Sequence, residues 1–77
     1  MSRAYVLISA KKPSDVKATA KFLSKKKGVV SAEVILGPYD IIATIEGRDL
    51  KELSTVVIND FFDLDQIQES TTCIVIE

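Results

Sequence analysis

Short apolar runs and amphipathic stretches alternate along this sequence in an order that few folds can accommodate. Apolar runs of strand length occur near residues 5–8, 29–36, 41–45 and 67–76. The second run carries Ser31 and Glu33 on alternate positions, which is typical of an edge strand with one wetter side. The third is apolar except for one threonine, which favours a central strand.

The first amphipathic stretch, residues 14–27, has helix signals at both ends. Ser14 fits an N-cap position, because its hydroxyl can accept a hydrogen bond from the first free backbone N–H groups. Gly28 follows where a C-terminal glycine cap belongs. Helical spacing places the apolar and basic side chains on two separate faces, Val16, Ala20 and Leu23 on one and Lys17, Lys21 and Lys25 on the other.

The second amphipathic stretch begins at a capping-box pattern, with Asp49 as the cap and Glu52 three residues later. The helix is predicted to end near Phe62, and residues 62–65 to form a loop before the last strand. Its buried face is predicted from the helical spacing of four apolar side chains, which are Leu50, Leu53, Val57 and Phe61.

The element order is therefore βαββαβ, which predicts an α+β, ferredoxin-like domain spanning residues 1–77. In that fold two helices cover one face of an antiparallel four-stranded sheet. Both sides of the strands are apolar, however, as Tyr5 and Leu7 alternate with Val6 and Ile8. An uncovered apolar face favours association. We therefore expect a second copy of the sheet to cover it, giving a dimeric α+β barrel.

The chain offers few groups for covalent or metal chemistry. A domain of 77 residues is marginal without extra stabilisation, and Cys73, its only cysteine, cannot form an internal disulfide. Without histidine, neither a zinc site nor a histidine-activated nucleophile is expected. We therefore expect no metal, no cofactor and no catalytic residue, and Cys73 is predicted to be a small core residue.

Nothing in the sequence predicts secretion or a membrane. Residues 1–3 lead directly into a short apolar run, which is unlike a signal peptide. No apolar run approaches the roughly 18 residues that a membrane-spanning helix needs. A cytoplasmic location is expected, and one free thiol fits a reducing compartment.

Charge is divided unequally along the chain. Residues 1–28 hold eight cationic side chains against one anionic, whereas residues 29–77 hold two cationic against ten anionic. Such asymmetry is compatible with contact to nucleic acid, with complementary faces that meet when chains assemble, or with a solvated helix face. The sequence leaves these three interpretations open.

Residues 37–43, Gly-Pro-Tyr-Asp-Ile-Ile-Ala, resemble the Gly-x-Tyr-Asp-apolar-apolar turn of the Lrp/AsnC effector domain, also called the RAM domain. Residues 28–37, 46–53 and 70–76 are similar to that family's second strand, entry to the second helix and last strand, so the resemblance covers essentially the whole chain. It implies a stand-alone form without the helix-turn-helix domain.

The resemblance implies a regulatory module that binds an amino-acid effector and acts in transcriptional regulation of amino-acid metabolism. It also implies that homodimers assemble into an octamer or decamer, or that the chain associates with full-length Lrp/AsnC regulators. No sequence-specific DNA binding by this chain and no membrane partner are expected.

A free amino acid needs a carboxylate near its ammonium and hydrogen-bond donors near its carboxylate. Asp40 meets the first need, while backbone N–H groups near Gly37 and the Thr72 hydroxyl meet the second. The resemblance adds Ser70, which keeps a hydroxyl where the family has threonine, and Tyr39 as a pocket wall. The alternative is that Asp40 only closes the turn through backbone N–H groups, with Tyr39 as a packed aromatic residue.

A second function class also fits this fold. Small dimeric α+β barrels can hold a catalytic carboxylate in their lumen, and Asp40 or Glu33 are the candidates here. Saturable binding without turnover would separate the binding module from the enzyme. RNA binding on the sheet is not expected, because residues 41–45 carry no aromatic side chain for base stacking.

Overall fold

The computed structural model describes residues 1–61 and 64–76 of the chain. Its elements follow the predicted order, with one additional 3₁₀ turn, η1, before the first helix. Their bounds are β1 Ser2–Ala10, η1 Pro13–Asp15, α1 Val16–Ser24, β2 Val29–Val34, β3 Ile41–Gly47, α2 Leu50–Asp60 and β4 Ile67–Ile74.

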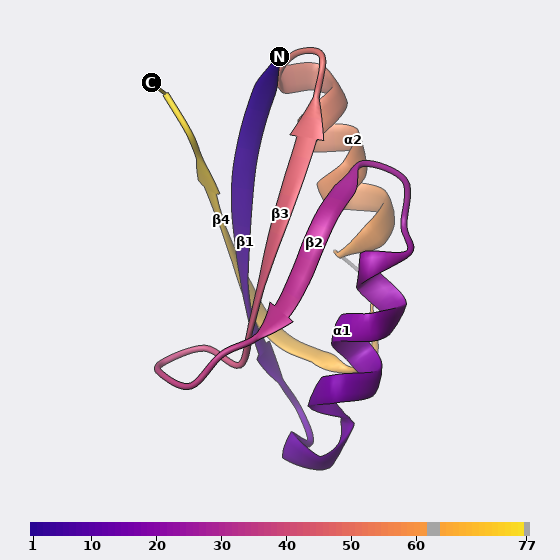
Figure 1. Ribbon diagram of the computed structural model, residues 1–77, viewed down its shortest axis with the longest axis vertical. Coiled ribbons are helices and arrows are strands. Elements are labelled where there is room, and N and C mark those ends of the chain that lie inside the picture. Colours follow the sequence, from indigo (N-terminus) through magenta and orange to yellow (C-terminus); the bar gives the residue numbers. More distant parts are fainter. Residues whose placement is uncertain (62–63, 77) are drawn as a thin grey trace.

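The four strands form one sheet in the order β2-β3-β1-β4, and every neighbouring pair is antiparallel. Both helices lie on the same side of this sheet (Figure 1). The predicted ferredoxin-like α+β fold is confirmed. The edge position of β2 and the central position of β3 are confirmed as well.

The core lies between the helices and one face of the sheet. Strand register places Val6 opposite Ala43 and Ile8 opposite Ile41, so these side chains share the helix-facing side. All four are completely buried, and the helices complete the core with buried apolar side chains that include Leu23, Leu53 and Phe61.

The start and end of α1 differ from the prediction. Ser14 is not its N-cap, because residue 13 is a proline that starts the η1 turn, and Asp15 precedes the helix without a side-chain cap bond. The helix ends at Ser24, earlier than predicted. Gly28 has a φ of +90° and turns the chain into β2, where its carbonyl accepts a hydrogen bond from Glu46 N at 2.9 Å.

The cap of α2 is confirmed, because the Asp49 side chain accepts a hydrogen bond from Glu52 N at 2.9 Å. Leu50 was wrongly predicted to be buried. It is the first helical residue and is 54% exposed, so the buried stripe begins at Leu53. The last residue of α2 is Asp60, and the predicted end at Phe62 lies outside the described residues.

The face of the sheet without helices, here called the open face, has an apolar centre and a polar margin. Tyr5, Leu7 and Ile42 are partly buried there. Cys73 pairs with Tyr5 on this face and is exposed, so the prediction that it belongs to the core is wrong. The reason is the register of β4, which pairs Cys73 with Tyr5 and places its side chain on the side of the sheet away from the helices. A second copy covering the open face stays a prediction.

The described part of the chain contains neither a membrane-spanning helix nor a cluster of metal-binding side chains. No helix in it is both long enough and apolar enough to cross a membrane. Within residues 1–61 and 64–76, no group of three or more cysteine and carboxylate side chains is close enough together to hold a metal ion.

Candidate functional site

The turn formed by residues 37–40 connects β2 to β3. It projects from one end of the sheet, and both chain termini lie near the other end (Figure 1). The connection is closed by a hydrogen bond from Ile35 N to the carbonyl of Asp40, at 2.8 Å. The motif singled out in the sequence therefore falls on a hydrogen-bonded turn at one end of the sheet.

Asp40 joins this turn to the end of β1. Its backbone N–H donates to the Ile8 carbonyl at 2.8 Å, and its carboxylate Oδ2 accepts from Ala10 N at 2.9 Å. The carboxylate thus continues the ladder between β1 and β3 where a backbone carbonyl would otherwise serve. Among the described residues, the only hydrogen bond to this carboxylate is the one from Ala10 to Oδ2.

Tyr39 reaches from the turn to strand β4. Its hydroxyl lies 3.1 Å from Thr71 Oγ1, and either group can donate. Thr71 pairs with Leu7 and therefore lies on the open face. The structure thus brings Tyr39, Asp40 and the Thr71 hydroxyl to the same end of the molecule.

Ser70 and Thr72 lie on the other side of the sheet. They pair with Ile8 and Val6, whose side chains face the helices. Thr72 lines a shallow, mainly apolar hollow of about 270 Å³ beside α2, together with side chains that include Leu53 and Ile74. Within one chain, Ser70 and Thr72 therefore do not share a face with the hydroxyl pair of Tyr39 and Thr71.

Gly37 is the most open position of the turn. An ideal Cβ built there would have no heavy atom within 4 Å, and its φ is not positive. Packing and backbone conformation inside this chain therefore do not require glycine at position 37. The free space beside it suits a ligand or a neighbouring chain.

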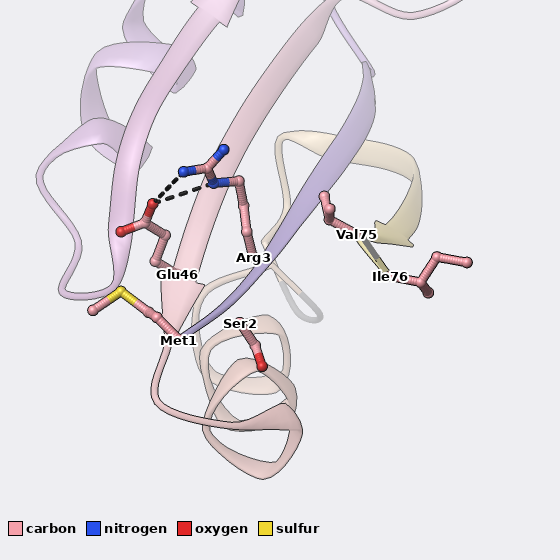
Figure 2. Close-up of a pocket in the computed structure, with 6 residues that line it drawn as sticks. All are labelled: Met1, Ser2, Arg3, Glu46, Val75 and Ile76. Carbon is pink, nitrogen blue, oxygen red and sulfur yellow. Dashed lines mark hydrogen bonds and ion pairs between the residues drawn. The ribbon is translucent and has the colours of Figure 1, made fainter.

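A separate hollow of about 420 Å³ lies at the other end of the sheet, near the termini (Figure 2). Here Arg3 and Glu46 point toward one another, and both Arg3 Nε and Nη2 lie 3.2 Å from Glu46 Oε2 (Figure 2). Hydrogen bonding to Glu46 raises the pKa of Arg3 above its ordinary value. Glu46 already balances the Arg3 guanidinium, which weakens this hollow as a site for an anionic group.

Sequence reasoning missed Thr71, Arg3 and Glu46. The pair of Arg3 and Glu46 is separated by 43 residues, so only strand register reveals it. Thr71 lies between Ser70 and Thr72 in the sequence, and the register of β4 decides which of the three side chains meets Tyr39. A shift of the strand register by one residue moves each side chain to the opposite face of the sheet.

The structure is a ferredoxin-like domain whose sheet has one face without helices and an exposed turn at one end. The chain matches the Lrp/AsnC ligand binding domain over residues 3–77, and it belongs to that family. The resemblance seen in the sequence is confirmed. The family model describes a ligand-binding domain and supports a regulatory, effector-binding role. A search of curated proteins found no match.

Solved structures agree with this assignment. TTHA0845 from Thermus thermophilus is 26% identical, with a TM-score of 0.90, covering 100% of this chain and 95% of that one. AsnC from E. coli is also 26% identical, with a TM-score of 0.87, over 99% of this chain but 51% of AsnC. A transcriptional regulator from Neisseria meningitidis, NMB0573, is 19% identical over 99% of this chain and 50% of its own, with a TM-score of 0.82, and shows the fold alone.

Proposed function

We propose that this chain is a regulatory module that binds a free amino acid and acts in transcriptional regulation of amino-acid metabolism. The observation that carries the proposal is the match to a ligand binding domain over residues 3–77. The module works through its own assembly or through association with full-length Lrp/AsnC regulators. The chain spans about half the length of AsnC.

The 37–40 turn is the proposed effector site, with Asp40 as the partner of the ligand ammonium. Hydrogen bonding to Ala10 N uses Oδ2 and fixes the carboxylate in place. The second oxygen, Oδ1, is then the one that accepts from the ammonium. A carboxylate held in this way loses little side-chain freedom on binding, which favours affinity.

The ligand carboxylate needs donors a few ångströms away from the ammonium. Backbone N–H groups near Gly37 supply them without a side chain in the way. Tyr39 and Thr71 already share one hydrogen bond at 3.1 Å, and one of the two hydroxyls can turn to donate to the ligand. Tyr39 also supplies an apolar wall for the effector.

Ser70 and Thr72 enter the proposed site only from a second chain. Their place on the helix-facing side of β4 separates them from the open-face hydroxyls of their own chain, but both residues are exposed. A site at a junction between dimers would combine the turn of one chain with these hydroxyls of a neighbour. Effector binding and assembly would then be linked, because the ligand stabilises the state that completes its site.

The chemical class of the effector is suggested by one structural neighbour. NMB0573 is described as a complex with L-Met. A free amino acid of this kind combines the ammonium and carboxylate that the turn can bind. The enzyme alternative has less support, since Asp40 is held by the backbone and Glu33 is an exposed residue on strand β2.

A thermal-shift screen of the chain against the standard amino acids tests this function. At least one should raise the melting temperature, because a ligand that binds only the folded state stabilises it by RT ln(1 + [L]/Kd). The N-acetyl derivative of the same amino acid is the matched control. It lacks the ammonium and should give no rise.

Two results would contradict the proposal. One is a screen in which no amino acid at about 100 times a typical micromolar Kd changes the melting temperature, since a shift worth about 2.7 kcal/mol is then expected. The other is an equal rise with the N-acetyl derivative, which would show that the ammonium is not recognised. Consumption of the ligand during incubation would instead support the enzyme.

A further inference from the structure

Seven lysines between residues 11 and 27 form a basic face along α1 and the segments at its two ends. It consists of Lys11, Lys12, Lys17, Lys21, Lys25, Lys26 and Lys27. The only anionic side chain in this stretch is that of Asp15. All seven except Lys26 are exposed. The opposite side of the helix carries the buried apolar residues, so the helix is anchored while its lysines face solvent.

These charges are not neutralised inside the described chain. The ion pairs in residues 1–61 and 64–76 join Arg3 to Glu46 and Arg48 to Glu52, and neither involves a lysine of the basic face. Lys26 lies 4.4 Å from the centre of the Phe22 ring, in a cation–π contact. The remaining ammonium groups keep their counterions until an anionic partner replaces them.

The basic face occupies one flank of the molecule. Helix α1 packs over β2, at one edge of the sheet, whereas β4 forms the other edge with Asp65 and Glu69 near its start (Figure 1). The net charge of −1 therefore hides a separation of opposite charges. An anionic partner would be attracted to the α1 flank and repelled from the β4 flank.

We infer that the basic face binds the phosphate backbone of duplex DNA, without sequence preference. Lys17, Lys21 and Lys25 are spaced one helical turn apart and span about 12 Å along the axis. A duplex presents about seven phosphate charges over the same length. A row of three to five exposed ammonium groups can therefore release several counterions on contact. This inference does not depend on the effector proposal.

Charge favours a polyanion as the partner of this face. Its cationic side chains are all lysines, whose ammonium groups bind phosphate as point charges. It has a single aromatic side chain, Phe22, whereas binding of unpaired bases uses several stacking platforms in succession. A duplex meets such a face with negative charges along its whole length.

Fluorescence anisotropy of a labelled duplex of about 20 base pairs, titrated from about 25 to 200 mM salt, tests the inference. Wild-type chain should bind at low salt, and two unrelated duplexes should bind alike. The triple variant Lys17→Gln, Lys21→Gln, Lys25→Gln should bind at least about 10-fold more weakly at 50 mM salt. Its slope of log K against log salt should be smaller by about 2.7, since each lost phosphate contact removes about 0.9.

Matched variants separate the basic face from net charge. Replacing the same three lysines by arginine keeps the charge and should keep the affinity. Lys51→Gln on α2 removes one charge away from the face and should change affinity less than 2-fold, unlike Lys21→Gln. Glutamine and lysine have nearly equal helix propensity, so circular dichroism should show every variant folded.

The inference is overturned if wild-type chain does not bind duplex at about 25 mM salt. It is also overturned if Lys51→Gln weakens binding as much as Lys21→Gln, or if the triple glutamine variant binds like wild type. Light scattering without DNA is a further test. A lower mass for the triple variant than for wild type would show that the basic face contacts a second copy, which would contradict the inference. A preference above 10-fold for one duplex sequence would contradict backbone recognition.

Discussion

At the scale of single residues, Gly28 and Gly37 both lie next to strand β2 but serve different purposes. Gly28 adopts a φ of +90°, and an ideal Cβ there would lie 2.7 Å from Val56 Cγ2. Gly37 has neither restriction. The structural requirement for glycine is thus local to position 28, and the described chain does not require glycine at position 37.

Gly28→Ala should destabilise the fold by about 1–3 kcal/mol, because alanine is strained at positive φ and must also displace Val56. Gly37→Ala is the matched control and should change the free energy of unfolding by less than about 0.5 kcal/mol. Urea denaturation of both variants measures the difference. Equal destabilisation by the two substitutions would contradict this account.

Asp40 combines a structural and a proposed binding role in one side chain. Removing the carboxylate in Asp40→Ala leaves Ala10 N without its acceptor, so this variant loses stability whatever the ligand does. Asp40→Asn keeps an oxygen for Ala10 N and removes only the charge. The asparagine variant therefore separates turn closure from ammonium binding.

At the scale of elements, the start of α2 is held by a small network. Asp49 accepts from Glu52 N, while Glu52 accepts from Arg48 N and from Arg48 Nε, each at 3.0 Å. The hydrogen bond from the Arg48 backbone, followed in size by the one from its side chain, lowers the pKa of Glu52 below its ordinary value. These contacts stabilise the charged form of Glu52 at the helix N-terminus.

A depressed folded-state pKa fixes the sign of the pH dependence. Glu52 contributes stability above the pH range where an unperturbed glutamic acid titrates, and this contribution is lost as pH falls through the lower folded pKa. Arg48→Met should move the pKa of Glu52 upward, but only in part, since the backbone bond remains. An NMR titration of the Glu52 carboxyl carbon measures this, and an unchanged pKa in the variant would contradict the assignment.

Most elements could be predicted because their signals are local. The Asp49 cap, the apolar face of α1 and the polar side of β2 each depend on residues a few positions apart. The prediction that Ser14 caps the first helix was wrong because proline at position 13 starts a 3₁₀ turn. This turn places Asp15, not Ser14, directly before the helix. The prediction that Leu50 is buried was wrong because helical spacing does not show where a helix first contacts the sheet.

The sequence locates the candidate site at one turn, but it does not show which side chains of the last strand meet that turn. Gly37, Tyr39 and Asp40 lie together because they belong to one short turn. Ser70 and Thr72 belong to an edge strand with polar side chains on both sides. The sequence therefore does not show which of its side chains face the helices. Pairing with β1 decides that Thr71 meets Tyr39, and that information is not local.

At the scale of the whole molecule, the open face predicts assembly. Tyr5, Leu7 and Ile42 form its partly buried apolar centre, and no helix of the described chain covers them. We expect at least dimers at micromolar concentration, and rings of four or five dimers by resemblance to the family. Light scattering should give at least twice the chain mass of 8.5 kDa, and a monomeric mass would contradict this.

Leu7→Glu should break that assembly, because it places a charge at the centre of the open face. Leu50→Glu makes the same chemical change at an exposed position on α2 and should leave the dimer intact. Circular dichroism confirms that both variants are folded before their masses are compared. Equal masses for the two variants would place the dimer contact elsewhere on the molecule.

Calorimetric titration of the effector into wild-type and Asp40→Asn chains tests the central claim most directly. A charge-assisted hydrogen bond contributes about 1.5–3 kcal/mol, so the variant should bind about 10- to 150-fold more weakly. Its melting temperature without ligand should stay near that of the wild type, because asparagine keeps the bond to Ala10 N. Equal affinity of the two chains would remove Asp40 from the effector site and leave it as the residue that closes the turn.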